Sequence, residues 1–322
     1  MDHRRLGAPS LACLVSSLVV VACGGPQPAR SEARTPLPVQ HDARVESIVD
    51  EELASLLRGR DIRNARIVVL SVEGGAVLAA SGRDRSGLRA ALATEEVRSH
   101  GSTAKPFTLA AALEEGVVRM EDTFEGGAIT RDGLTIEDHE MHGVMSLEDV
   151  LAYSSNVGTI RVFDRVGPGP LARALGRFRL PVPDDFGTRP GRDAQFAEGA
   201  LLEASSLEVA AGYLVLARGG TWPDGAAVVS PTTAAQALAL LERAVSRGDA
   251  TGHVAAVPGL RVGGKTGTVR LEGGGTFGVF AGVVPVEAPR YVVLVGVEAE
   301  GEHHSGSTLA APSFARVVRR LL

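Results

Sequence analysis

The order of strand-like and helix-like segments most restricts how this chain can fold. Five runs rich in apolar and β-branched residues predict strands, at 65–72, 76–80, 261–269, 276–286 and 291–298. The first two flank a Gly-Gly turn and predict a hairpin. Helical periodicity predicts helices near the two ends, at 45–58 and 312–322. This order indicates an α+β chain whose terminal strands share one antiparallel sheet over an inserted helical region.

Helix-capping residues mark several helices in that middle region. A helix is predicted from about 103 to 115, because Gly116 stands where a C-terminal cap would. Ser146 and Ser205 each begin a capping-box pattern, with an acid three residues later. Ser230 is followed by a proline at the first helical position, which starts a further helix.

Lysine is almost absent from this chain. Of 33 basic residues only Lys105 and Lys265 are lysines, and the other 31 are arginines. Arginine keeps its proton in proteins, whereas a lysine amine can become neutral. We therefore expect these two positions to need an amine that can exchange a proton.

Both lysines fall in short motifs that carry chemistry. Ser102 and Lys105 share one face of a predicted helix start, where a neutral amine can activate a hydroxyl and the helix dipole favours an oxyanion. Ser154 and Asn156 offer a hydroxyl for proton relay and an amide. The strand segment Lys265–Thr268 offers a cation, two hydroxyls and Gly267, which would leave room for a substrate backbone. Each motif alone is common; together they include both lysines and one of two asparagines.

In this order the three motifs resemble the signature set of penicillin-binding transpeptidases and serine β-lactamases. The flanking segments 101–108, 154–159 and 264–268 resemble those of class B penicillin-binding proteins. The resemblance runs from 45 to 322. It implies a β-lactamase/transpeptidase-like fold, with an antiparallel sheet flanked by helices and an inserted all-helical lobe that closes a cleft over Ser102.

The resemblance also implies a role for each motif residue. Ser102 would attack the penultimate D-alanine carbonyl of a peptidoglycan stem peptide and form an acyl-enzyme, and Lys105 would accept its proton. Ser154 would relay a proton to the leaving amine, and Asn156 would position Lys105 and the substrate amide.

The strand motif would bind the substrate carboxylate. Lys265 would supply positive potential, and Thr266 and Thr268 would donate hydrogen bonds, beside Gly267. The backbone amides of Ser102 and Thr268 would form the oxyanion hole. β-Lactams would acylate the same serine, and no metal or organic cofactor is implied. The net charge of −5 leaves no basic field for nucleic acid.

Two other functions remain open from the sequence. A serine β-lactamase is disfavoured, because the class A pattern Glu-x-x-Leu-Asn is absent and Ser154 stands where class C enzymes have tyrosine. A non-catalytic penicillin-binding sensor would keep the acylating serine but has no evident need for two ionisable lysines.

Other clusters of polar residues are given structural interpretations. The segment 138–142 crowds acids and histidines without the spacing of a zinc helix, and we interpret it as a polar loop. His303 and His304 are interpreted as a surface turn. Three acids that could activate water are interpreted as loop or helix-start acids: Glu198, Glu203 and Glu208.

The N-terminus predicts export. Residues 1–22 have two arginines followed by a short apolar stretch, which is typical of a signal peptide. The segment ends in Val-Ala-Cys23-Gly24, which resembles a lipoprotein cleavage and acylation site. Residues 23–44 then predict a flexible tether before the penicillin-binding transpeptidase domain at 45–322. We expect an exported lipoprotein anchored by lipid at the periplasmic face of a membrane; Gly24 favours the outer membrane.

Overall fold

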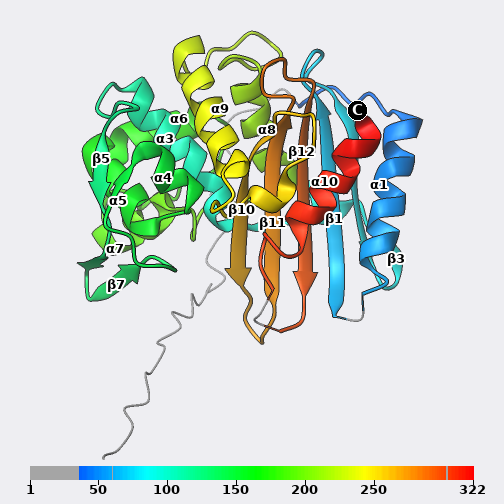
Figure 1. Cartoon of the computed structure of the whole chain (residues 1–322), viewed down its shortest axis with the longest axis horizontal. Coiled ribbons are helices and arrows are strands. Elements are labelled where there is room, and N and C mark those ends of the chain that lie inside the picture. Colours follow the sequence, from blue (N-terminus) through cyan, green and yellow to red (C-terminus); the bar gives the residue numbers. More distant parts are fainter. Residues whose placement is uncertain (1–35, 60, 302–303) are drawn as a thin grey trace, which may run out of the picture.

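A six-stranded antiparallel sheet forms the centre of the fold (Figure 1). The computed structural model describes residues 36–59, 61–301 and 304–322. The strand order is β10-β11-β12-β1-β2-β3. The bounds are β1 Ile62–Ser71, β2 Val77–Asp84, β3 Gly87–Leu88, β10 Gly263–Arg270, β11 Thr276–Val284 and β12 Tyr291–Ala299. β1 and β12 are neighbours, with Ile67 opposite Val295, so the predicted sharing of one sheet by the two ends of the chain is confirmed.

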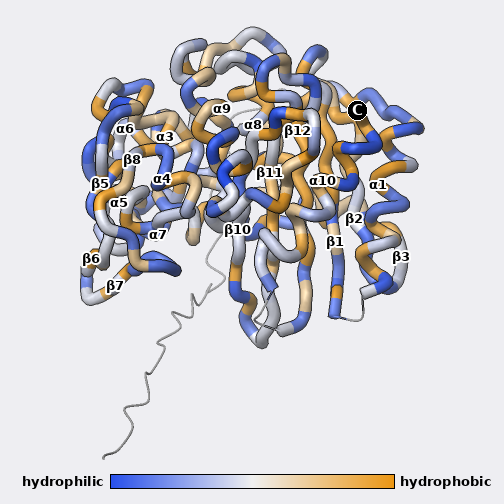
Figure 2. Tube along the Cα trace, in the orientation of Figure 1, coloured by the Kyte–Doolittle hydropathy of each residue, from blue (hydrophilic) through white to orange (hydrophobic). Residues whose placement is uncertain are grey.

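Helices cover both faces of this sheet. On one face lie α1 (Ala43–Leu56) and α10 (Ala310–Leu321), which contact each other and the strands. On the other face lies α8 (Ser206–Ala217). Successive residues of a strand point to opposite faces; accordingly Ile67 and Val69 pack with α1 and α10, whereas Val68 and Leu70 pack with α8. Both sides of β1 are buried at residues 67–70, and these four residues are all apolar. Hydrophobic colour is concentrated in the strands of the sheet (Figure 2).

The middle of the chain forms a lobe beside the β10 edge of the sheet (Figure 1). The helices of the lobe are α3 Lys105–Glu114, α4 Leu147–Ala152, α5 Asn156–Val166, α6 Pro168–Arg177 and α7 Pro190–Ala197. Helix α9 (Pro231–Ser246) joins the lobe to the sheet. Helix α3 is central, because it packs on α5, α6 and α9. Helix α9 also packs on β10 and so connects the lobe to the sheet. Shorter helical segments are α2 Ala91–Thr94, η1 Gly101–Ala104 and η2 His253–Ala255.

The helix starts predicted from capping residues are confirmed. Ser146 and Ser205 are the N-caps of α4 and α8, and each forms a complete capping box with the acid three residues on. Ser230 caps α9 and Pro231 is its first residue.

The lobe is not all-helical, which corrects the expectation. It contains the two-stranded pairs β6–β7 (Ala128–Arg131 and Leu134–Glu137) and β5–β8 (Thr123–Glu125 and Val144–Ser146). The turn between β6 and β7 is Asp132-Gly133, with φ of 51° and 76°. Asp-Gly is a favoured pair for a hairpin turn that needs two positive φ angles. A third pair joins β4 (Arg98–Ser99) to β9 (Glu203–Ala204).

The end of the expected tether is folded onto the sheet. The amide of Val77 donates to the carbonyl of Pro38 at 2.8 Å, and the amide of Gln40 donates back to Val77 at 3.0 Å. Asp42 then caps α1, so the helix begins at Ala43, before the predicted boundary at 45. Residues 1–35, with the expected signal peptide and Cys23, lie outside the described residues. Within the described ranges, no helix has the length and apolar character needed to cross a bilayer.

Candidate active site

The first motif lies where the chain enters the lobe. Ser102 is in η1, which leads directly into α3, and Lys105 is the first residue of α3. Gly101 has a φ of 55°, a conformation that favours glycine. A Cβ at Gly101 would lie 3.3 Å from the Thr268 amide nitrogen, so the entry to η1 packs tightly on β10. The second half of the strand motif is therefore beside Ser102.

The amine of Lys105 is the centre of the site. Its Nζ lies 2.8 Å from Ser102 Oγ, 2.9 Å from the Ser154 carbonyl oxygen and 2.6 Å from Asn156 Oδ1. The Ser154 hydroxyl is 3.5 Å from the same nitrogen. Lys105 is fully buried, whereas Ser102 is partly exposed. The structure thus brings the first two motifs together around one amine.

The turn between α4 and α5 presents the second motif. Ser154 has a φ of 61°, which is uncommon for a residue with a side chain and turns its carbonyl and hydroxyl toward Lys105. Ser155 caps α5 by accepting from the Gly158 amide. Asn156 Nδ2 donates to the Glu137 carbonyl at 3.2 Å, which fixes the amide so that its oxygen faces Lys105.

Asp138 holds this turn in place. Its carboxylate accepts from the Asn156 amide at 2.6 Å, the Val157 amide at 3.0 Å and the Ser155 hydroxyl at 2.7 Å. A carboxylate on the first amides of a helix is stabilised by the helix dipole. The interpretation of 138–142 as a plain polar loop is therefore incomplete: Asp138 supports the second motif.

The third motif lies on β10, the edge strand next to the lobe. Lys265 is fully buried, and its Nζ donates to the Thr266 carbonyl at 3.1 Å and the Thr266 hydroxyl at 3.3 Å. The Thr266 hydroxyl in turn donates to Thr251 at 3.0 Å. Thr268 is exposed, and its hydroxyl accepts from the Gly306 amide at 3.1 Å. Of the two threonines, Thr268 is thus the one open to a ligand.

Gly267 serves a different purpose from the one expected. A Cβ at this position would lie 2.2 Å from the carbonyl oxygen of His100, so the missing side chain lets β10 pack against the segment that leads to Ser102. The space is filled by the protein's own backbone rather than left for substrate. His100 is itself buried, and its Nε2 lies 2.9 Å from the Ser206 hydroxyl of α8.

Burial dominates the electrostatics of both lysines. It lowers the pKa of Lys105, an effect that the carboxylates of Glu198 and Asp138 oppose. Burial lowers the pKa of Lys265 still more clearly, and the positive charge of Lys105 acts in the same direction. A lowered pKa is what allows an amine to act as a general base near neutral pH.

Glu198 is a site residue that the sequence interpretation set aside. Its carboxylate lies 3.7 Å from Lys105 Nζ, and the side chain is only 10% exposed. Glu203 is exposed but lies in the short strand β9 and not in a loop or at a helix start. Glu208 is a helix-start acid as expected, in the capping box of α8. His303 lies outside the described residues.

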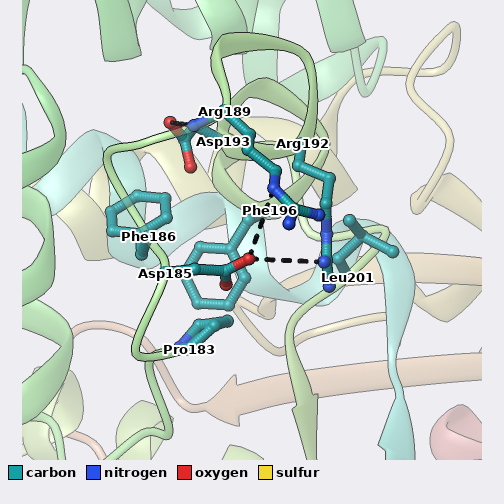
Figure 3. Close-up of a pocket in the computed structure, with 8 residues that line it drawn as sticks. All are labelled: Pro183, Asp185, Phe186, Arg189, Arg192, Asp193, Phe196 and Leu201. Carbon is teal, nitrogen blue, oxygen red and sulfur yellow. Dashed lines mark hydrogen bonds and ion pairs between the residues drawn. The ribbon is translucent and has the colours of Figure 1, made fainter. Parts of the chain in front are cut away.

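A small pocket lies in the lobe near α7, as Figure 3 shows. Its lining residues are Pro183, Asp185, Phe186, Arg189, Arg192, Asp193, Phe196 and Leu201. Asp185 forms ion pairs with Arg189 at 3.7 Å and Arg192 at 3.5 Å across it. The pocket contains none of the motif residues.

A comparison with known families decides the assignment of this site. The family model for the penicillin-binding protein transpeptidase domain matches residues 65–319. The chain belongs to this family. The matched range extends from β1 into α10 and includes all three motifs, and the α+β fold expected from the resemblance is confirmed.

Individual transpeptidase relatives agree with this assignment. A probable peptidoglycan D,D-transpeptidase PenA of Neisseria flavescens is 28% identical over 319 residues, with 86% of this chain and 80% of that protein covered. The chain spans between 50% and 58% of the length of several other curated relatives.

Two solved structures share the fold. The transpeptidase domain of Burkholderia pseudomallei penicillin-binding protein 3 is 27% identical with a TM-score of 0.79, covering 88% of this chain and 95% of that one. Penicillin-binding protein 3 of Mycobacterium tuberculosis, complexed with aztreonam, is 25% identical with a TM-score of 0.78, covering 87% and 77%.

Proposed function

We propose that this protein is a peptidoglycan D,D-transpeptidase or D,D-carboxypeptidase that works through an acyl-enzyme on Ser102. The observation that carries the proposal is the set of contacts around Lys105. Two of its close partners, the Ser154 carbonyl and Asn156 Oδ1, can only accept hydrogen bonds. A neutral amine has two N–H donors and one lone pair. It therefore satisfies both oxygens and keeps its lone pair for the Ser102 hydroxyl at 2.8 Å.

Acylation follows from this arrangement. Ser102 Oγ attacks the carbonyl carbon between two D-alanine residues while its proton passes to Lys105 Nζ. The C–N bond then breaks, and the leaving amine takes up a proton relayed from Lys105 through the Ser154 hydroxyl, 3.5 Å away. The products are an ester on Ser102 and free D-alanine.

Deacylation reverses the proton path. An amine of a second stem peptide, or water, attacks the ester carbonyl and transfers a proton through the same groups back to the Ser102 oxygen. An amine acceptor gives a cross-link, and water gives a shortened stem peptide.

The strand motif supplies the binding groups in this proposal. The substrate carboxylate is attracted by Lys265 and accepts from the exposed Thr268 hydroxyl, with Thr266 holding the Lys265 amine. The amides of Ser102 and Thr268 receive the developing oxyanion. The tight packing of Gly101 against the Thr268 backbone supports this pairing.

Turnover of a defined stem peptide tests the proposal. A peptide ending in D-Ala-D-Ala, with and without an amine acceptor, is incubated with the wild-type protein and with Ser102→Ala, and the products are identified by mass. Ser102-dependent release of D-alanine is expected, with a cross-linked product if the reaction is a transpeptidation and a hydrolysed one otherwise. Release of D-alanine that persists in Ser102→Ala would contradict the proposal.

We also propose that the protein is exported and lipidated on Cys23. The support is the sequence of residues 1–24, with its basic start, apolar stretch and cysteine. Expression of the full chain in a bacterium with labelled palmitate, with Cys23→Ser as control, tests this. Label in the wild-type chain that is lost in the variant is expected, in a membrane fraction. Equal labelling of both, or of neither, would contradict lipidation at Cys23.

A further inference from the structure

Glu198 occupies a fixed position next to the catalytic amine. It follows α7, and both neighbours are attached to the segment that carries Ser102 and Lys105. The Ala197 carbonyl accepts from the Thr108 hydroxyl of α3 at 2.6 Å. A Cβ at Gly199 would lie 2.4 Å from the Gly101 carbonyl oxygen, which shows how closely the chain passes η1. The carboxylate is therefore held beside Lys105 by the backbone on both sides.

The distance decides how Glu198 can act. Its Oε2 is 3.7 Å from Lys105 Nζ, beyond hydrogen-bond length. Three oxygens lie much closer to the amine, at 2.6–2.9 Å: Ser102 Oγ, the Ser154 carbonyl oxygen and Asn156 Oδ1. An ammonium would donate its three protons to those oxygens. Glu198 thus interacts with Lys105 through charge, and in a buried setting this interaction is weakly screened.

Two other charged groups, Asp138 and Lys265, also act on the Lys105 amine. Asp138, directly after β7, attracts the ammonium, whereas Lys265 on β10 repels it. Asp138 is already engaged by two backbone amides and the Ser155 hydroxyl. Burial raises the pKa of Glu198, and the neighbouring Lys105 charge opposes that rise. Among the described residues, Glu198 is the carboxylate that forms an ion pair with Lys105.

We propose that Glu198 is a positioning residue that sets the basicity of Lys105, and so the pH range in which Ser102 is acylated. The inference rests on the proposed acyl-enzyme mechanism. When Ser102 gives its proton to Lys105, positive charge appears 3.7 Å from a fixed carboxylate. The carboxylate stabilises that charge and makes the amine a stronger base. The same attraction keeps Lys105 protonated up to a higher pH in the resting protein.

These two effects change the acylation rate in opposite directions at low pH and at high pH. Without the carboxylate, Lys105 becomes neutral at lower pH, because an opposite charge within about 4–6 Å raises an amine pKa by roughly 1–3 units. A less basic amine also transfers the proton less readily, so the maximal rate falls. Plotted against pH, the acylation rates of the wild type and of a variant without the Glu198 charge should therefore cross.

The test is the rate constant for acylation by benzylpenicillin, followed by intact mass from about pH 5 to pH 9. It compares the wild type with Glu198→Gln, which keeps the shape and removes the charge. Glu203→Gln is the matched control, since it removes the same charge from an exposed position nearby in the chain, in β9. For Glu198→Gln we expect the pH at which acylation reaches half of its maximal rate to fall by about one pH unit or more. We also expect the maximal rate constant to fall several-fold.

Distinct outcomes separate this inference from the proposed function. A Glu198→Gln profile that is lower by one factor at every pH, with the wild-type midpoint, would overturn the inference and leave the acyl-enzyme mechanism intact. An upward shift of the midpoint would overturn it too. If the wild type itself forms no adduct, the proposed function fails. Should Glu198→Gln not fold, Glu198→Asp moves the charge away by one methylene, and an unchanged midpoint there would equally overturn the inference.

Discussion

The backbone of Gly267 and the carbonyl oxygen of His100 are packed so closely that a Cβ on Gly267 would lie 2.2 Å from that oxygen. The contact joins the strand that carries Lys265 and Thr268 to the segment that carries Ser102. It fixes the distance between the nucleophile and the strand motif, and neither partner is a flexible side chain that can move aside.

Gly267→Ala should therefore force β10 away from η1. We expect the free energy of unfolding to fall by about 1–3 kcal/mol, as in other overpacked interiors, with slower acylation of Ser102. Urea denaturation and an acylation assay measure the two effects. Gly74→Ala is the control, because a Cβ at that exposed position meets nothing within 4 Å. A Gly267→Ala variant as stable and reactive as the wild type would show that the contact relaxes freely.

Asp138→Ala should loosen the turn that presents Ser154 and Asn156. The variant loses a helix cap that accepts from two amides and a hydroxyl, so stability should fall by about 1–2 kcal/mol. Acylation should slow by roughly ten- to a hundred-fold, because the groups around Lys105 lose their alignment. Thermal denaturation and acylation kinetics check this, with exposed Glu140→Ala as the control. Equal behaviour of the two variants would contradict a supporting role for Asp138.

Lys105→Arg should retain positive charge but lose the base. A guanidinium does not become neutral in the accessible pH range, so the Ser102 proton has no acceptor. We expect the acylation rate to fall by about 10²–10⁴-fold at every pH. Measurement of adduct formation over hours gives the rate, and circular dichroism shows whether the variant is folded. A folded Lys105→Arg protein with near wild-type acylation would mean that another group accepts the proton.

His100 should make the protein less stable in acid. Burial lowers the pKa of His100 to about 3 from 6.5, so the unfolded chain binds a proton there between pH 6.5 and 3 while the folded chain does not. Stability therefore falls as the pH decreases through this window, by about 3 kcal/mol at pH 4. Urea denaturation at pH 7 and pH 4 measures the loss, which should be smaller in His100→Gln. Exposed His139→Gln should keep the full wild-type loss; if both variants keep it, His100 is not the cause.

The sheet and the helix starts could be predicted because their signals are local. The apolar runs of β1, β11 and β12 are long and β-branched, and the capping boxes at Ser146 and Ser205 need only four residues. The β6–β7 hairpin was missed although Asp132-Gly133 is a local hairpin signal. Its strands are only four residues long, and Ile136 is the one buried residue in them.

The supporting residues of the site could not be predicted in the same way. The three motifs stand out because rare lysines and asparagines fall inside them. Asp138 and Glu198, by contrast, are two acids among 38, and only the folded lobe brings them to Lys105. Gly267 was singled out correctly, but for substrate access, because its contact with His100 depends on how β10 packs against η1.

Mass analysis of the protein after reaction with benzylpenicillin tests directly whether Ser102 is acylated. The wild type, Ser102→Ala and exposed Ser86→Ala are compared, and the adduct is located by digestion and peptide sequencing. We expect one covalent adduct on the peptide that contains Ser102, present in the wild type and in Ser86→Ala and absent from Ser102→Ala. An adduct that survives in Ser102→Ala, or a wild-type protein that forms none, would contradict it.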